Sequence, residues 1–283
     1  MRRPSLSAAI VLMLPGAGFI ALFLAAALGM SLLQSVGYYN MTGPSGFSLQ
    51  YWGKVFSSQV WDSFVYSVWI GTASAFGTLV LAYPLALFLR RRTPWNAFMN
   101  TLLRVPLFMP ALVAAFILVN IMDYNGLING TLVGLGLIEK PVRMLRNEWG
   151  AIVILIQIWK NVPFQLLIIA SVVQTIRTDI EEAAYNLGAG RFEVFRHILL
   201  PLSMPGIMIA VVLVFIGAFG DFAINTIAGP TYPPPLAVLM VTSANLMQEW
   251  NFAACIGVLI MAVSIVFVFL YTRLARAIQE AEA

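Results

Sequence analysis

Two ionisable side chains lie inside long apolar stretches of this sequence. Lys160 falls in the stretch 149–176, three residues before Pro163, and Asp221 follows a glycine near the end of the stretch 203–224. A charge at the centre of a bilayer costs at least about 2.5–3.5 kcal/mol, so such residues usually have a function or a charge partner. Two interpretations stand for each. Lys160 faces a solute path, or it pairs with a carboxylate or reaches the interface; Asp221 lines such a path, or marks a close helix contact.

Aromatic residues accompany both charges. Trp159 precedes Lys160, and Phe219 lies two residues before Asp221. Aromatic faces attract cations, so both rings are candidates for the same solute path. Most aromatic residues in so apolar a chain nevertheless pack in the protein or face lipid.

Other kinds of chemistry are poorly represented. The chain has one cysteine, Cys255, and one histidine, His197, which excludes a disulfide framework and a zinc site built from both residue types. It also lacks the G-x-x-x-x-G-K-[ST] loop that cradles nucleotide phosphates. Lys160 and Asp221 alone are too few for an intramembrane active site. We therefore predict no catalytic residue, metal ligand or cofactor site.

The elements that position these residues are predicted to be membrane-spanning helices. The 283 residues are 60% hydrophobic and 10% charged, with a mean hydropathy of +0.88. These values are typical of an all-α integral membrane protein. Long apolar runs predict six spans, the first of them uncleaved: 6–33, 63–89, 102–122, 149–176, 203–224 and 252–272.

Two polar connections separate the first four spans. Residues 35–60 and 123–148 are rich in glycine and polar residues, and Asn129-Gly130-Thr131 matches the short pattern of a glycosylation acceptor. Pro106 and Pro110 predict kinks in the third span. We expect a first helix with its connection over 1–60 and a five-helix core over 61–283.

Basic residues predict the orientation of the chain. Six spans place both termini on one side of the membrane, and eleven of the sixteen basic residues fall on that side. The positive-inside rule makes it cytoplasmic. The eleven are Arg2, Arg3, Arg90, Arg91, Arg92, Arg104, Arg177, Arg191, Arg196, Arg273 and Arg276; Lys54, Lys140, Arg143 and Arg146 lie opposite, and Lys160 lies between.

A short polar segment, 178–201, lies between the fourth and fifth spans on the predicted cytoplasmic side. Thr178 and Glu181 have the spacing of a capping box, which predicts a helix start. Gly188 is placed to end that helix in a left-handed conformation. A second short helix is expected over 191–200, closed by Pro201. On spacing alone this segment is an amphipathic surface helix pair, with or without a docking role.

The spacing of this segment resembles a known motif. Glu182-Ala183-Ala184, then Gly188, then Ile198-x-Leu200-Pro201 are similar to the EAA loop of permease subunits in binding-protein-dependent type I ABC importers, which have the MetI-like fold. The resemblance covers about residues 60–275. It implies that this loop forms coupling helices seated in a groove of a cytoplasmic ATPase. By position, it implies interface roles for Glu182, Ala183, Ala184 and Gly188, braced by Ile198, Leu200 and Pro201.

The same resemblance implies the complex of which the chain is a subunit. It would be the permease subunit of an importer in a bacterial inner membrane, working by alternating access with an ABC ATPase dimer, a second identical or homologous permease and a periplasmic solute-binding protein. ATP and Mg²⁺ would be bound by the ATPase. A secondary transporter is the competing class, but the sequence shows no inverted repeat.

The substrate is less clearly indicated. The stretch 200–206, Phe215 and Gly220-Asp221-Phe222 resemble the polyamine and iron branch of these permeases, and similar tracts occur in phosphonate and opine importers. Sugar importers are a further alternative. For a polyamine, the cation would be attracted by acidic and aromatic residues, with candidates Asp221, Asp123, Glu249, Trp69, Trp159 and Phe219.

Overall fold

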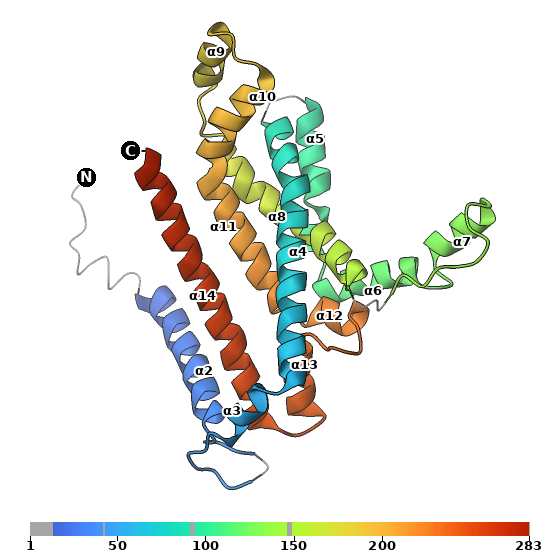
Figure 1. The fold of residues 1–283 in the computed structure, drawn as a ribbon, viewed down its shortest axis with the longest axis vertical. Helices are drawn as coiled ribbons and strands as arrows, with labels where there is room; N and C mark the ends of the chain where they lie inside the picture. Colours follow the sequence, from blue (N-terminus) through green and yellow to red (C-terminus); the bar gives the residue numbers. More distant parts are fainter. Residues whose placement is uncertain (1–13, 42, 91–93, 146–148, 283) are drawn as a thin grey trace. The chain divides into compact units, whose positions relative to one another are not determined.

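The computed structural model describes residues 14–41, 43–90, 94–145 and 149–282 (Figure 1). Of the basic residues counted above, Arg2, Arg3, Arg91, Arg92 and Arg146 lie outside the described residues. Contacts divide the chain into unit 1 (Met1–Trp61 and Leu239–Met261) and unit 2 (Asp62–Val238 and Ala262–Ala283). Three helices contribute to both units: α4 (Ser58–Leu89), α13 (Leu236–Asn245) and α14 (Trp250–Glu282).

The prediction of an all-α protein with six spans is confirmed. The described residues contain helices and no strands. Six of their helical stretches are long and apolar enough to cross a membrane: Leu14–Ser35, Ser58–Leu89, Ala111–Gly134, Ala151–Val173, Arg191–Phe219 and Trp250–Arg273.

Unit 1 joins the first span to the start of the last one. It contains the π-helical turn η1 (Leu14–Gly18), α2 (Phe19–Ser35) and α3 (Gln50–Val55). The amide of Asn251 in α14 donates to the carbonyl of Gln34 at 2.6 Å, and Lys54 pairs with Glu249 at 2.6 Å. These bonds hold the predicted connection 35–60 against the start of α14.

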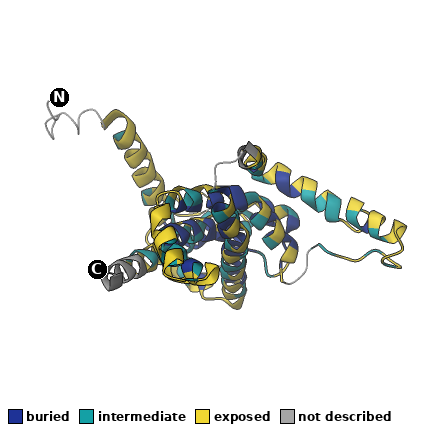
Figure 2. Cartoon of the chain, turned by 90° about the horizontal axis from the view of Figure 1, so that it is seen from above, coloured by how far each residue is buried: buried dark blue, intermediate teal, exposed yellow. Residues whose placement is uncertain are grey.

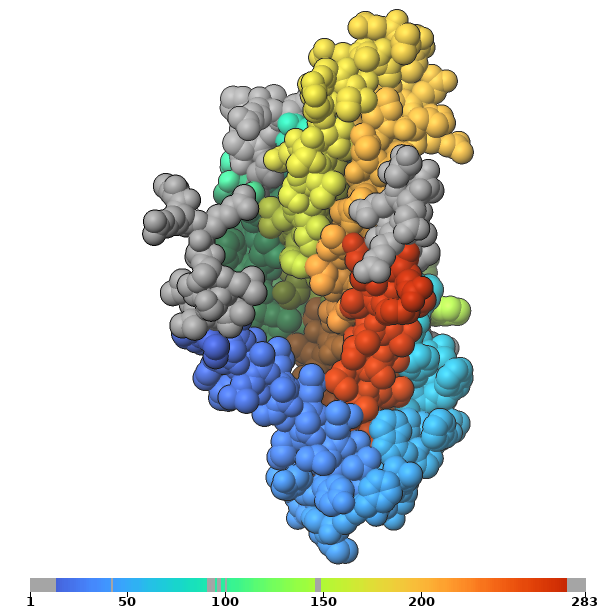
Figure 3. All heavy atoms as spheres, turned by 90° about the vertical axis from the view of Figure 1, so that its left-hand side faces the viewer, coloured from blue at the N-terminus to red at the C-terminus, as the bar shows by residue number. Residues whose placement is uncertain are grey.

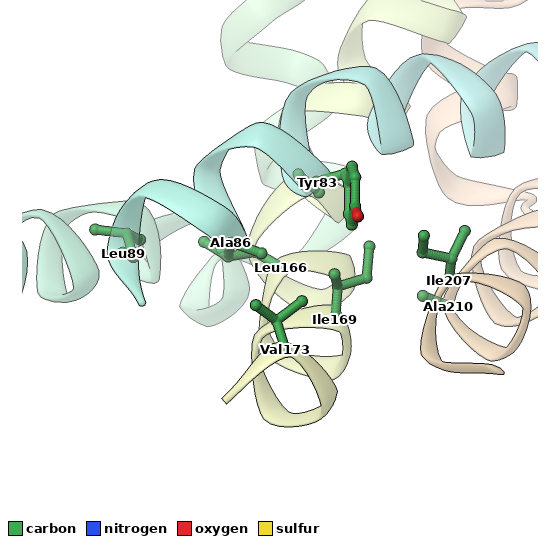
Figure 4. Close-up of a cluster of buried hydrophobic side chains, with 9 residues drawn as sticks. Tyr83, Ala86, Leu89, Leu166, Ile169, Val173, Ile207 and Ala210 are labelled. Atoms are coloured by element: carbon green, nitrogen blue, oxygen red, sulfur yellow. The ribbon is translucent and has the colours of Figure 1, made fainter. Parts of the chain in front are cut away.

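The core of unit 2 is formed where α4, α8 (Ala151–Val173) and α11 (Leu200–Phe219) meet. Figure 4 shows side chains from the three helices pointing into one apolar cluster, among them Ala86, Ile169 and Ala210. Gly206 allows close packing here, because a Cβ at this position would lie 2.6 Å from Cγ2 of Val172. In Figure 2 the buried residues gather inside the helix bundle, while exposed residues cover its outer surfaces.

The third span differs from its prediction. Instead of one kinked helix over 102–122, the chain forms α5 (Pro94–Leu103), the 3-10 turn η2 (Val105–Phe108) and then α6 (Ala111–Met122). Pro110 precedes α6 with φ −56° and ψ 139°, an extended conformation. Because proline lacks an N–H and cannot continue the ladder, two nearby prolines break the helix here rather than bend it.

The second connection is also more ordered than its composition suggested. Its first part forms α7 (Leu127–Gly134), which belongs to the apolar stretch Ala111–Gly134, and Asn129 in α7 bonds to residues on both sides of this helix. The Asn129 amide donates to the carbonyls of Asp123 at 3.0 Å and Val142 at 2.9 Å, and its Oδ1 accepts from the N–H of Val142. The residue is 0% exposed. The glycosylation interpretation is therefore wrong, since an acceptor asparagine must be accessible.

The fifth span ends earlier than predicted. α11 stops at Phe219, and α12 (Ala223–Ala228) follows after a break at Gly220 and Asp221. Residues 229–235, with their prolines, form the expected connection, and α13 follows. The break places Asp221 at a helix start rather than inside a span.

Candidate functional site

The segment 178–201 forms the expected helix, glycine elbow and second helix. α9 (Thr178–Asn186) is followed by Gly188, which has φ +88°, and α10 (Arg191–Val194) begins after this glycine. The N–H of Gly188 bonds to the carbonyl of Tyr185, and the N–H of Ala189 to that of Ala184, both at 3.0 Å. These bonds satisfy the last carbonyls of α9, as left-handed glycine ends do. The predicted role of Gly188 in helix termination is confirmed.

The predicted capping box at Thr178 is wrong. Arg177, not Thr178, is the residue that precedes the first helical turn, and no side chain caps it. Glu181 instead bonds to Arg90, the residue that follows α4. A capping contact occurs one helix later, where the Glu193 carboxylate accepts from the N–H of Gly190 at 2.7 Å. The Glu181 carboxylate, which the local spacing assigned to the cap, therefore forms an ion pair with Arg90 instead.

Pro201 does not close the second helix as predicted. The π-helical turn η3 (Phe195–Leu199) follows α10 directly, and α11 continues from it at Leu200. Pro201 lies in the first turn of α11, directly after a π-helical turn in which the N–H of Leu200 bonds to the carbonyl of Phe195. The chain is therefore helical from the surface segment into the fifth span.

The predicted coupling residues lie on a surface of unit 2 that is open in this chain. Glu182, Ala183 and Gly188 are exposed, while the remaining four are half-buried: Ala184, Ile198, Leu200 and Pro201. Large apolar side chains are exposed beside them, with Leu187 90% and Phe192 68% accessible. In Figure 3 this segment is the yellow and light-orange projection at the top.

This surface carries charges of both signs. Acidic residues lie in the first turn of α9, whereas α10 and η3 carry basic residues together with Glu193. Exposed apolar groups bordered by charges of both signs are typical of a protein-binding surface. The surface is suited to a folded protein partner.

Lys160 lies near enough to Asp221 for its charge to act on the carboxylate, although no ion pair joins the two side chains. Both side chains are half-buried, Lys160 in α8 and Asp221 between α11 and α12. Burial raises the pKa of Asp221, while the N–H groups of Ile224 and Asn225 and the charge of Lys160 act to lower it. Asp221 Oδ2 accepts from Ile224 N at 2.8 Å and from Asn225 N at 3.3 Å, so this carboxylate also caps α12.

Amide side chains accompany each of the two charges, and these residues together are called the polar cluster. Gln157 and Asn161 share a face of α8 with Lys160, and Asn225 bonds through its amide to the carbonyl of Asp221 at 2.8 Å. Gln157 Nε2 and Asn225 Oδ1 are buried without a hydrogen-bond partner in the described part of the chain. A buried polar atom is costly when unpaired. Gln157 thus has an unpaired donor on the Lys160 helix, and Asn225 has an unpaired acceptor next to Asp221.

The two aromatic candidates lie elsewhere. Phe219 is 1% exposed and packs against Phe215 and Phe64, with ring centroids 5.6 and 6.4 Å away. Trp159 is 37% exposed and lines an apolar cavity of about 790 Å³ bounded by α4, α5, η2 and α8. In this conformation the four predicted path residues do not form one site, and only Lys160 and Asp221 influence each other electrostatically.

A family comparison decides what kind of protein carries these features. The family described as the inner membrane component of binding-protein-dependent transport systems matches residues 78–280. The chain belongs to this family. It is an inner-membrane permease subunit of an ABC importer, a multi-pass membrane protein without catalytic activity of its own.

Individual relatives agree with this assignment. The spermidine/putrescine transport system permease protein PotB of Haemophilus influenzae is 24% identical over 220 residues, covering 77% of this chain and 75% of the relative. A bacterial ABC transporter that imports the acidic polysaccharide alginate superposes with a TM-score of 0.79 at 19% identity, covering 95% of both chains. A second structure of a bacterial alginate ABC transporter, in complex with a pentasaccharide-bound periplasmic protein, has a TM-score of 0.77 at 20% identity over 95% of this chain and 94% of that one. At these identities the structural likeness concerns the fold alone.

Sequence reasoning missed one feature of the permease's surface segment, the contact between Arg90 and Glu181. In the sequence, Arg90 is only a basic residue at the end of a span. Nothing in the local spacing links it to Glu181, which lies 91 residues later. No motif signals such a pair, because it depends on how α4 and α9 pack.

Proposed function

We propose that segment 178–201 of this permease docks on an ABC ATPase and transmits its closure to the spans. The observation that carries this proposal is the exposed helix–glycine–helix surface with Leu187 at its tip, which is continuous with α11. Glu182, Ala183, Ala184 and Gly188 form the contact. Ile198, Leu200 and Pro201 connect it to the fifth span.

The orientation and partners follow from this proposal. The excess of basic residues at one set of span ends supports a cytoplasmic location for segment 178–201 and for both termini. An ATPase dimer requires two docking segments, so a second permease, identical or homologous, completes the assembly. The ATPase binds ATP and Mg²⁺, and this chain needs no cofactor. A periplasmic solute-binding protein delivers the solute from the opposite side.

We propose further that the polar cluster around Lys160 and Asp221 lines the solute path. It combines two half-buried charges with the unpaired amide atoms of Gln157 and Asn225. Lys160 and Asp221 carry opposite formal charges, so together they add no net formal charge to the cluster. Such a site favours small polar solutes through hydrogen bonds rather than through net charge.

The proposed solute is a small polyamine. This proposal rests on the relatives whose names specify spermidine and putrescine, including PotB of Haemophilus influenzae. Sugars, phosphonates and opines are the alternatives. Because the cluster is neutral overall, selection for a cation would come mainly from the binding protein.

The affinity of the cognate solute-binding protein tests this substrate proposal. Titration calorimetry with putrescine, spermidine, an alginate oligosaccharide, maltose and a phosphonate should show binding of a polyamine, with dissociation constants at least about 100-fold larger for the other solutes. The same polyamine should raise ATP hydrolysis by the reconstituted complex. Preferential binding of a saccharide or phosphonate would contradict the polyamine proposal and leave the docking proposal intact.

A further inference from the structure

Arg90 connects the end of α4 to the α8–α9 junction and to α9 itself. Its guanidinium donates to the carboxylate of Glu181 in α9 and to the backbone carbonyl of Ile176, which precedes α9. A planar guanidinium can hold two acceptors at once in a fixed geometry. Arg90 therefore restrains the position of α9 and the angle at which the chain enters it.

The Arg90–Glu181 pair is shielded from water. The two side chains are 13% and 17% exposed, whereas the neighbouring pair Arg177–Asp179 is 76% and 56% exposed. Exposed pairs contribute little because water screens them, but removal of one member of a shielded pair leaves the other charge without compensation. The two pairs thus offer a matched comparison within the same segment.

The same face of α4 also holds the far end of the surface segment. Tyr83 lies seven residues before Arg90, two helical turns away on one face. Its hydroxyl is 2.9 Å from the hydroxyl of Ser203 in α11, and its ring lies 5.9 Å from that of Phe195 in η3. α4 is therefore attached to the beginning of the segment through Arg90 and to its end through Tyr83.

We propose that Arg90 is a positioning residue that clamps α9 to α4, so that a displacement of the docking segment moves the second span together with the fifth. This inference rests on the proposed docking role of segment 178–201. Without the clamp, α9 would pivot at the α8 end, and the ATPase would move α9 without moving α4.

A double-mutant cycle in the assembled complex tests the clamp. The complex contains the permeases, the ATPase and the solute-loaded binding protein, and the readout is the ratio of stimulated to basal ATP hydrolysis in proteoliposomes. We expect Arg90→Gln and Glu181→Gln each to lower this ratio at least about fivefold. The double variant should be no worse than either single variant, because both remove the same contact. Arg90→Lys keeps the charge but lacks the planar fork that holds two acceptors, so its stimulation should lie between those of the wild type and Arg90→Gln.

Controls separate this role from assembly and from docking. Arg177→Gln removes the exposed pair and should leave the ratio unchanged. Co-purification of the ATPase should be normal in all variants, and cross-linking from a Leu187→Cys variant reports docking independently. Normal stimulation in Arg90→Gln, additive losses in the double variant, or loss of assembly in the Arg90 variants would each overturn the clamp, while the docking proposal is judged by the cross-link.

Discussion

Replacing Gly188 by valine is expected to reduce solute-stimulated ATP hydrolysis of the complex to its basal rate. Gly188 has φ +88°, and a Cβ at this position would meet no atom within 4 Å. The cost of the side chain is therefore conformational. It amounts to at least about 1–2 kcal/mol for an L-residue in this region and more for a β-branched one. The chain relieves this strain by changing the elbow between α9 and α10, which moves Leu187 and Phe192 relative to each other.

A glycine two residues later provides the matched control for this variant. Gly190 has φ −76°, and a Cβ there would make only an ordinary contact, 3.7 Å from Glu193 Oε2. Gly190→Val should leave stimulation within about twofold of the wild type. Both variants should insert into the membrane normally, since neither position is in the apolar core. Wild-type transport by Gly188→Val would contradict the importance of the elbow.

Asp221→Asn is expected to lower solute transport about tenfold or more. The amide retains an oxygen that can accept from the N–H groups of Ile224 and Asn225, so the cap of α12 is preserved. The charge is lost, however, and Lys160 is left without its balance in the span. A lone charge there costs about 2.5–3.5 kcal/mol, and each 1.4 kcal/mol changes an equilibrium about tenfold.

The reciprocal substitution distinguishes a charge pair from a cap. Lys160→Met should show a similar loss, and the double variant with Asp221→Asn should recover part of it, because charge balance is restored. Asp62→Asn is the control, an acid whose Oδ2 accepts from the Tyr232 hydroxyl at 3.1 Å outside the cluster. Transport is measured as uptake of labelled solute into proteoliposomes. Near-normal uptake by Asp221→Asn would mean that Asp221 acts only as a cap.

Features governed by local chemistry were predictable from the sequence. The apolar runs determined the six spans, because spanning helices must satisfy their backbone internally and need a minimum length. Gly188 was identifiable because few other residues adopt its conformation. The approach of Lys160 to Asp221 was not itself predicted, although each was selected for its charge.

Features governed by tertiary contacts were not predictable. The carboxylate of Glu181 satisfies a capping pattern in the sequence, yet in the folded chain it pairs with Arg90. Pro201 reads as a helix stop, but η3 and α11 form a continuous helical path through it. Phe219 was selected for its aromatic face, and its burial against Phe215 and Phe64 follows from packing that no spacing encodes. For Glu181 and Phe219, the deciding contacts come from elements that are distant in the sequence.

The docking of segment 178–201 on the ATPase is tested most directly by site-specific cross-linking. The only native cysteine, Cys255, is 0% exposed and donates to the carbonyl of Ser35, so a photo-crosslinker attached to Leu187→Cys reports on the elbow. The control is Leu137→Cys, in the connection after α7, where the native side chain is 67% exposed. We expect a covalent permease–ATPase product from Leu187→Cys and none from Leu137→Cys. An assembled complex that gives no such product from Leu187→Cys would contradict the account.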